Sequence, residues 1–169
     1  MTESLLSDAF SHHTWATLRL FDTCRNLDTG QLATAVPGTY GSIIDTLRHL
    51  VGADSSYLYA LTGGRTAPVD ESGMSVAELQ VVMEANRDAW GSLLAQELDP
   101  DTVVVRHRDD GSESRAPLGV RLAQAIHHGT DHRSQVCTTL TTLGVEPPEI
   151  DVWDFASQDG RLEEVPPSS

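Results

Sequence analysis

The chain has 169 residues, of which 39% are apolar, and a net charge of −14. This length suits one compact domain with a substantial core, so we expect residues 1–169 to form a single domain. Only 11 residues are Lys or Arg, whereas binding to nucleic acid or to an anionic membrane requires clustered positive charge. We therefore expect neither nucleic acid nor a membrane as a partner.

The chain has two cysteines, Cys24 and Cys137, and neither lies in a Cys-x-x-Cys pattern. Two thiols are too few for a disulfide scaffold, which favours a reducing compartment. The first residues include an acid instead of the basic start of a secretion signal. No apolar run approaches the roughly 18 residues of a membrane span. These features predict a cytoplasmic protein.

Four segments show the apolar periodicity of helices with one buried face. The predicted helices cover residues 5–28, 42–62, 76–98 and 117–143. Ser75 and Glu78 form a capping-box pattern at the start of the third helix. Pro117 suits the first turn of the fourth helix. Four such helices predict an all-α four-helix bundle.

Residues 102–116 break the helical pattern with three consecutive valines and then Asp110-Gly111, a turn sequence. This predicts a short β-hairpin inside the connector between the third and fourth helices. The connector is long enough to form a crossover that lets these two helices run parallel, although its length does not require this. Residues 144–169 lack helical periodicity and are predicted to form an extended acidic tail.

Two histidines of the fourth predicted helix, His128 and His132, are separated by one helical turn and share a side of the helix. Two imidazoles at this spacing can hold one metal ion without bending the backbone. They could equally be hydrogen-bonded core residues. The adjacent His127 points away from the apolar face and is expected to be solvated.

A metal site would need a third ligand, and periodicity leaves its identity open. His13 lies on the inward stripe of the first predicted helix. His49 lies among small residues of the second helix, on a face that either lines a cavity or contacts water. His107 falls in the predicted hairpin and is expected to be exposed.

Two stretches of the chain together resemble the DinB family of metalloenzymes. They are Thr39–Asp54, read as TYGSIIDTLRHLVGAD, and His128–Gln135, read as HGTDHRSQ. The resemblance implies a four-helix bundle with a long crossover between its last two helices, and a divalent metal held by His49, His128 and His132. The sequence departs from the family at Asp131, where many members have a histidine, and at Ser134, where glycine is usual.

Three imidazole ligands leave at least one coordination position open, as in a catalytic site. We expect zinc or nickel ahead of iron or manganese, since imidazole accepts several divalent ions. Similar proteins include transferases and isomerases that use mycothiol or bacillithiol, so the resemblance implies a small-molecule substrate, ranked first as a low-molecular-weight thiol in a transferase reaction. The alternatives are a hydrolase that uses a metal-bound water and a non-catalytic module stabilised by its metal.

No catalytic triad, phosphate-binding loop or H-E-x-x-H motif is visible. The candidates for a general base are Asp45, Asp131 and His13. Asp45 could instead orient His49 or be solvated, and Asp131 could be an ordinary surface acid. A homodimer is a further expectation for a bundle of this kind.

Overall fold

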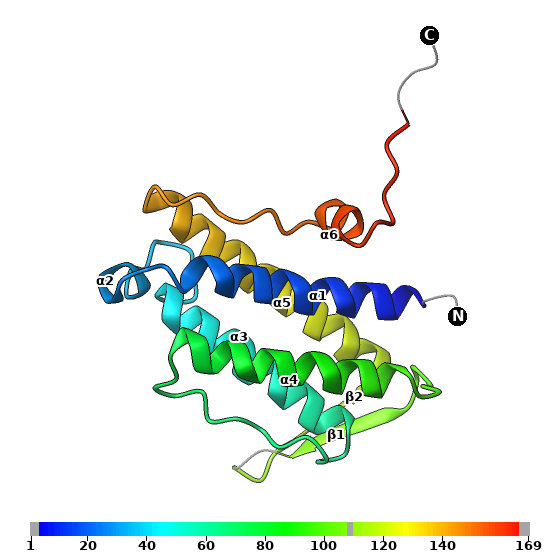
Figure 1. The fold of residues 1–169 in the computed structure, drawn as a ribbon. Helices are drawn as coiled ribbons and strands as arrows, with labels where there is room; N and C mark the ends of the chain where they lie inside the picture. The colour runs from blue at the N-terminus through cyan, green and yellow to red at the C-terminus, as the bar shows by residue number, and fades with distance from the viewer. Residues whose placement is uncertain (1–3, 108–109, 166–169) are drawn as a thin grey trace.

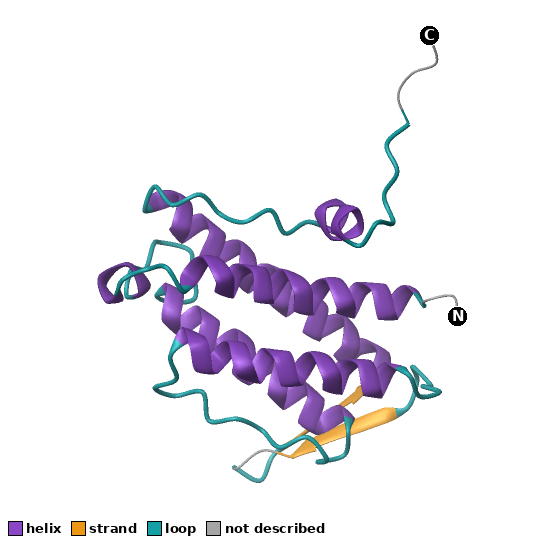
Figure 2. Ribbon diagram, in the orientation of Figure 1, coloured by secondary structure: helices purple, strands orange, loops and turns teal. Residues whose placement is uncertain are grey.

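The computed structural model describes residues 4–107 and 110–165. Residues 1–3, part of the predicted hairpin turn at 108–109 and the end of the predicted tail at 166–169 lie outside the described residues. Four long helices form the bundle (Figure 1), and a small two-stranded sheet lies at one end of it (Figure 2). The long helices are α1 (Leu5–Cys24), α3 (Ile43–Leu61), α4 (Val76–Leu94) and α5 (Leu118–Thr142). The predicted fold class is confirmed.

The helix starts follow from local capping. The Ser42 side chain accepts a hydrogen bond from the Asp45 backbone N–H at the start of α3. The predicted capping box of Ser75 and Glu78 is present at the start of α4. Helix α1 ends at Cys24, earlier than predicted, because Asp28 caps a separate four-residue helix, α2 (Thr29–Leu32).

Two clusters of buried side chains fix the direction of each helix. One cluster joins the C-terminal halves of α1 and α5 to the N-terminal halves of α3 and α4. The other joins the opposite halves of the same four helices. Helices α3 and α4 are therefore parallel to each other and antiparallel to α1 and α5 (Figure 1).

The length of the connector allowed a parallel arrangement of the last two long helices. In the structure, α4 and α5 are antiparallel. The segment that travels back along the bundle is residues 62–75, between α3 and α4 (Figure 1). The connector between α4 and α5 instead contains the β-hairpin, and α5 begins at the end of the bundle where α4 stops. A long connector sets an upper limit on the distance between two helix ends, but helix packing decides which route the chain takes.

The hairpin consists of β1 (Val103–His107) and β2 (Glu113–Pro117), paired antiparallel with Val103 opposite Pro117. The guanidinium of Arg121 donates hydrogen bonds to the backbone oxygens of Val104 and Ser114. These bonds attach both strands to the first turn of α5.

The prediction of an extended tail is wrong for Val152–Gln158, which form α6. Seven residues are too few for a periodic pattern to be recognised. The helix packs against α1 (Figure 1), where the Phe155 ring lies 5.4 Å from that of Trp15 and the indole N–H of Trp15 donates to Gln158. None of the helices in the described part of the chain is long and apolar enough to cross a membrane.

Candidate metal centre

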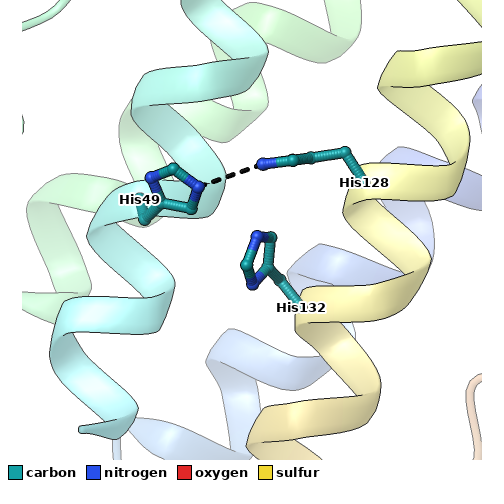
Figure 3. Close-up of side chains that lie close together, drawn as sticks. All are labelled: His49, His128 and His132. Carbon is teal, nitrogen blue, oxygen red and sulfur yellow. Dashed lines mark hydrogen bonds between the residues drawn. The ribbon is translucent and has the colours of Figure 1, made fainter. Parts of the chain in front are cut away.

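Three histidines from two helices converge between α3 and α5 (Figure 3). His49 projects from α3, and His128 and His132 project from α5. The Nε2 atoms of His49 and His128 are 3.0 Å apart, and the candidate ligand atoms of all three residues lie within 4.8 Å of one another. Two imidazole nitrogens bound to one cation at about 2.0–2.1 Å lie roughly 2.9–3.4 Å apart for bond angles of about 90–109°. The rings of His49 and His128 are hydrogen-bonded at this distance (Figure 3), and the same separation fits two ligands of a shared cation.

Hydrogen bonds determine which nitrogen of His132 is available as a ligand. The side-chain oxygen of Gln135 accepts the backbone N–H of Tyr40 at 3.0 Å and also lies 3.0 Å from Nδ1 of His132. A backbone N–H can only donate, so the Gln135 atom between the two groups is the oxygen, and His132 must donate from Nδ1. The lone pair of its Nε2 is left free, as a metal ligand requires.

Aromatic rings surround the cluster. The Tyr40 ring stacks on the His49 imidazole, with ring centroids 4.1 Å apart and planes inclined by 14°. The same ring meets the edge of His132, and Tyr57 meets His128 edge to face at 5.8 Å. These contacts hold the imidazoles in place. They also resolve the ambiguous face of α3, because His49 lies half-buried beneath Tyr40.

Burial and mutual repulsion keep two of the three imidazoles neutral. The pKa of His128 is lowered to about 4, chiefly because burial disfavours its charged form and also because His132 and His49 are close. Burial and His132 lower the pKa of His49, while the carboxylate of Glu71 opposes this shift. Both residues therefore present lone pairs at neutral pH, which metal binding requires.

A cavity of about 570 Å³ opens beside His49. Its lining includes Tyr40, Asp45, Arg48 and Glu71. The carboxyl group of Glu71 lies directly on Gly52 of α3, where any Cβ atom would clash with it. The glycine thus lets a carboxylate from the connector between α3 and α4 approach the helix that carries His49. The cavity gives small molecules access to one side of the cluster.

The three candidate bases occupy different surroundings. Asp45 lines the cavity beside His49, accepts a hydrogen bond from the Ser42 hydroxyl at 2.6 Å and lies 3.7 Å from the Arg48 guanidinium. Asp131 is exposed on α5. The structure does not bring His13 into the cluster. Of the other histidines, His127 is exposed, and His107 is exposed beside Glu113.

His13 belongs to a buried polar network on the other side of α5. Its ring lies 3.0 Å from the carboxylate of Asp54 through Nε2 and 3.1 Å from the guanidinium of Arg133 through Nδ1. Arginine can only donate, so Nδ1 accepts and Nε2 donates to Asp54. Asp54 also accepts the indole N–H of Trp90 and a side-chain N–H of Asn86. Both nitrogens of His13 are thus occupied, which makes it a structural residue.

Sequence patterns did not indicate several residues that shape the site. Gln135 follows His132 by three positions, a spacing that could have pointed to its contact with the imidazole. Tyr40 and Glu71 lie in connectors, where no periodicity predicts a direction. Asp54 has no local signal, because its partners come from α1 and α4.

The fold and the site together define a class: helical-bundle proteins that carry three histidines in an arrangement compatible with metal binding. A comparison with known protein families identifies the family of this chain. The sequence model of the DinB family matches residues 1–164, and the chain belongs to this family.

A solved structure supports the same fold. The chain is similar to a DinB-like protein from Bacillus cereus, with a TM-score of 0.62 and 17% sequence identity. The match covers 89% of this chain and all of that one. No protein with curated annotation matches the chain.

Proposed function

We propose that His49, His128 and His132 hold a divalent cation and that the protein is a metal-dependent transferase acting on a low-molecular-weight thiol. The observation that carries the proposal is the convergence of three imidazoles beside an open cavity, with the pKa values of His49 and His128 lowered and His132 oriented by Gln135. Zinc and nickel are the first candidates for the cation, because imidazole ligands suit both. A bound divalent ion would lower the pKa of a thiol or of water in its open coordination position.

The chain's own residues would supply the remaining functions. The cavity of about 570 Å³ beside His49 has the size of a small-molecule site. Arg48 lines it and offers a positive charge to a carboxylate of the thiol substrate. Asp45 and Glu71 line it too, and either carboxylate could accept the proton that the thiol releases. Asp131 is exposed on α5 and is a weaker candidate.

In the proposed reaction the thiol sulfur forms a bond to an electrophilic carbon of a second small molecule. That carbon loses its leaving group together with the bonding electron pair. The thiol proton passes to a carboxylate of the cavity or to water. No oxidant or reductant is needed.

The experiment is a panel of reactions with metal-loaded protein. Mycothiol, bacillithiol and glutathione are each incubated with monochlorobimane, and adducts are quantified by mass spectrometry. Adduct formation above the uncatalysed rate that is lost in His128→Ala and kept in His127→Ala supports the proposal. His127 is a matched control because it is an exposed histidine adjacent in sequence.

Two outcomes would contradict thiol transfer. Hydrolysis of a panel of esters and amides, without any thiol adduct, would favour the hydrolase. Unfolding on chelation, without either reaction, would favour a non-catalytic module in which the metal joins α3 to α5.

A further inference from the structure

A second and larger cavity lies on the side of α5 that faces away from the histidine cluster. Its volume is about 940 Å³, and it is enclosed by α1, α5 and the segment of residues 150–161 that includes α6. Most of its wall is apolar, with Leu5, Ile126, Val152 and Phe155 among the lining residues. We call it the α6 cavity. Its size falls within the range of small-molecule sites, roughly 300–1,000 Å³.

The segment that closes the α6 cavity is held by specific bonds. The His12 ring donates a hydrogen bond from Nε2 to the backbone oxygen of Ile150 at 2.9 Å. Arg161, near the other end of the segment, forms an ion pair with Asp8 of α1 at 2.6 Å. The Asp151 side chain caps α6. These contacts hold the outer wall of the cavity in position against α1.

One lining residue, Arg133, brings a positive charge to this apolar space. Arg133 is only 3% exposed, and its recorded partners are all neutral: the ring nitrogen and backbone oxygen of His13 and the hydroxyls of Thr17 and Thr130. Within residues 4–107 and 110–165, no carboxylate lies within ion-pair distance of its guanidinium, and its Nε has no hydrogen-bond partner. Asp54, whose negative charge acts on Arg133, is separated from it by the His13 ring.

A buried guanidinium is stabilised by an anion in direct contact, and its planar donors match a carboxylate best. The other charged groups of the cavity limit the charge of such an anion. Asp8 and Asp151 line the same space together with Arg161, which pairs with Asp8. The lining charges other than Arg133 therefore sum to about −1, which disfavours a multiply charged phosphate. An apolar wall, one buried cation without a direct counter-ion among the described residues and a surplus of one negative charge among the other lining residues together select a monocarboxylate with an apolar body.

We propose that the α6 cavity binds an apolar monocarboxylic acid, a molecule of the medium-chain fatty acid type, with its carboxylate at Arg133 and its hydrocarbon portion under α6. The proposal does not depend on the histidine cluster, which lies across α5. It assigns the protein a second small-molecule site.

The test compares three probes of equal chain length on the wild-type protein as purified. Decanoate, decanol and decylamine are titrated below their micellar concentrations by isothermal titration calorimetry. We expect decanoate to bind at least tenfold more tightly than decanol, and decylamine to bind most weakly. Equal affinity for decanoate and decanol would overturn the proposal, and so would the absence of binding by decanoate.

The location of the bound ligand is tested with the thiol of Cys137, which lies in the cavity wall. Cys137 lines the cavity and is partly exposed, whereas Cys24 is fully buried, so alkylation of the folded protein reports on Cys137. Decanoate should slow this alkylation in proportion to occupancy. Binding measured by calorimetry without protection of Cys137 would place the ligand elsewhere and contradict the proposal.

Two variants complete the test. Arg133→Met should weaken decanoate at least tenfold and leave decanol unchanged. Ala156→Phe fills the cavity from α6 and should abolish binding of both ligands. Because Ala156→Phe leaves the buried network of Arg133 intact, it decides the question even if Arg133→Met fails to fold. Unchanged decanoate binding in Ala156→Phe would overturn the proposal.

Discussion

Two clusters of polar side chains lie close together inside this bundle, and they differ in how their hydrogen-bonding capacity is used. In the network around Asp54, the carboxylate accepts N–H groups from His13, Asn86 and Trp90, and Arg133 donates to the remaining nitrogen of His13. The donors and acceptors of Asp54 and His13 are matched there, and among the described residues of the network only Arg133, at its edge, keeps a donor without a partner. The histidine cluster instead holds three bases, with Nε2 of His49 against Nε2 of His128.

The difference separates a structural cluster from a candidate functional one. Matched donors and acceptors, such as those of Asp54 and His13, stabilise the fold without a ligand. Three imidazoles whose ring nitrogens lie close together offer a site that a cation would fill. Adjacent residues of α5, His132 and Arg133, contribute to the two clusters from different faces of the helix. The comparison predicts that substitutions in the Asp54 network act on stability, whereas substitutions in the histidine cluster act on metal binding.

The largest effect on stability is expected for Asp54→Ala. Removing this carboxylate leaves the ring N–H of His13 and the indole N–H of Trp90 without an acceptor in the core and leaves the charge of Arg133 without compensation. Breaking a buried charged network in this way costs about 3–5 kcal/mol. Urea unfolding of the metal-free protein measures the loss. Asp88→Ala, on the exposed face of α4, is the control, expected to change stability by less than about 0.5 kcal/mol. Equal losses in both variants would refute a structural role for the network.

A smaller loss is expected for Gly129→Ala. A Cβ atom at this position would clash with the ring of His13, and it would crowd the guanidinium of Arg133. Such overpacking costs about 1–3 kcal/mol. Gly91→Ala in α4 is the matched control, because a Cβ atom there meets nothing within 4 Å. It should stabilise the protein by up to about 1 kcal/mol through helix propensity. Thermal unfolding distinguishes the two, and stabilisation by Gly129→Ala would be inconsistent with the observed close approach.

Gln135→Ala should leave stability nearly unchanged and weaken metal binding. Without the Gln135 oxygen, His132 is no longer held with its proton on Nδ1. Loss of such an orienting partner typically costs 10–100-fold in affinity, or about 1.4–2.7 kcal/mol. Competition with a chromophoric chelator measures the change. Gln96→Ala, an exposed glutamine just after α4 and outside the site, serves as control. Wild-type metal affinity in Gln135→Ala would show that Gln135 does not orient His132 for metal binding.

The smallest effect concerns acidification of the metal-free protein. In the unfolded chain imidazoles take up protons near pH 6.5, whereas folded His128 stays neutral to about pH 4 and the pKa of His49 is also lowered. The unfolded state therefore binds more protons in this interval, and stability falls as the pH drops from 6.5 toward 4. His128→Gln should reduce the slope of stability against pH. An identical slope in wild type and variant would argue against the lowered pKa.

Different parts of the structure were predictable to different degrees. The four long helices and the hairpin follow from periodicity and turn residues, which are local signals. The pair His128 and His132 follows from helical spacing. The third histidine of the candidate site did not, because the face of α3 that carries His49 is covered by Tyr40 from a connector. Only the family resemblance pointed to His49.

Features that depend on contacts between distant segments escaped sequence reasoning. Helix α6 is short and packs against Trp15 and His12, more than 130 residues away in sequence. Residues 62–75, which travel back along the bundle, connect α3 to α4, because helix packing and not connector length decides the direction of each helix. Asp54 and Arg133 meet through His13 only once three helices have assembled.

The most direct measurement is the metal content of the protein purified without chelators, determined by elemental analysis alongside two single variants of α5. We expect about one equivalent of a divalent metal per chain in the wild type and in His127→Ala, and a substoichiometric amount in a folded His128→Ala. Equal metal content in His128→Ala and the wild type would contradict the proposed site, as would a wild-type protein that binds no zinc or nickel when either ion is added.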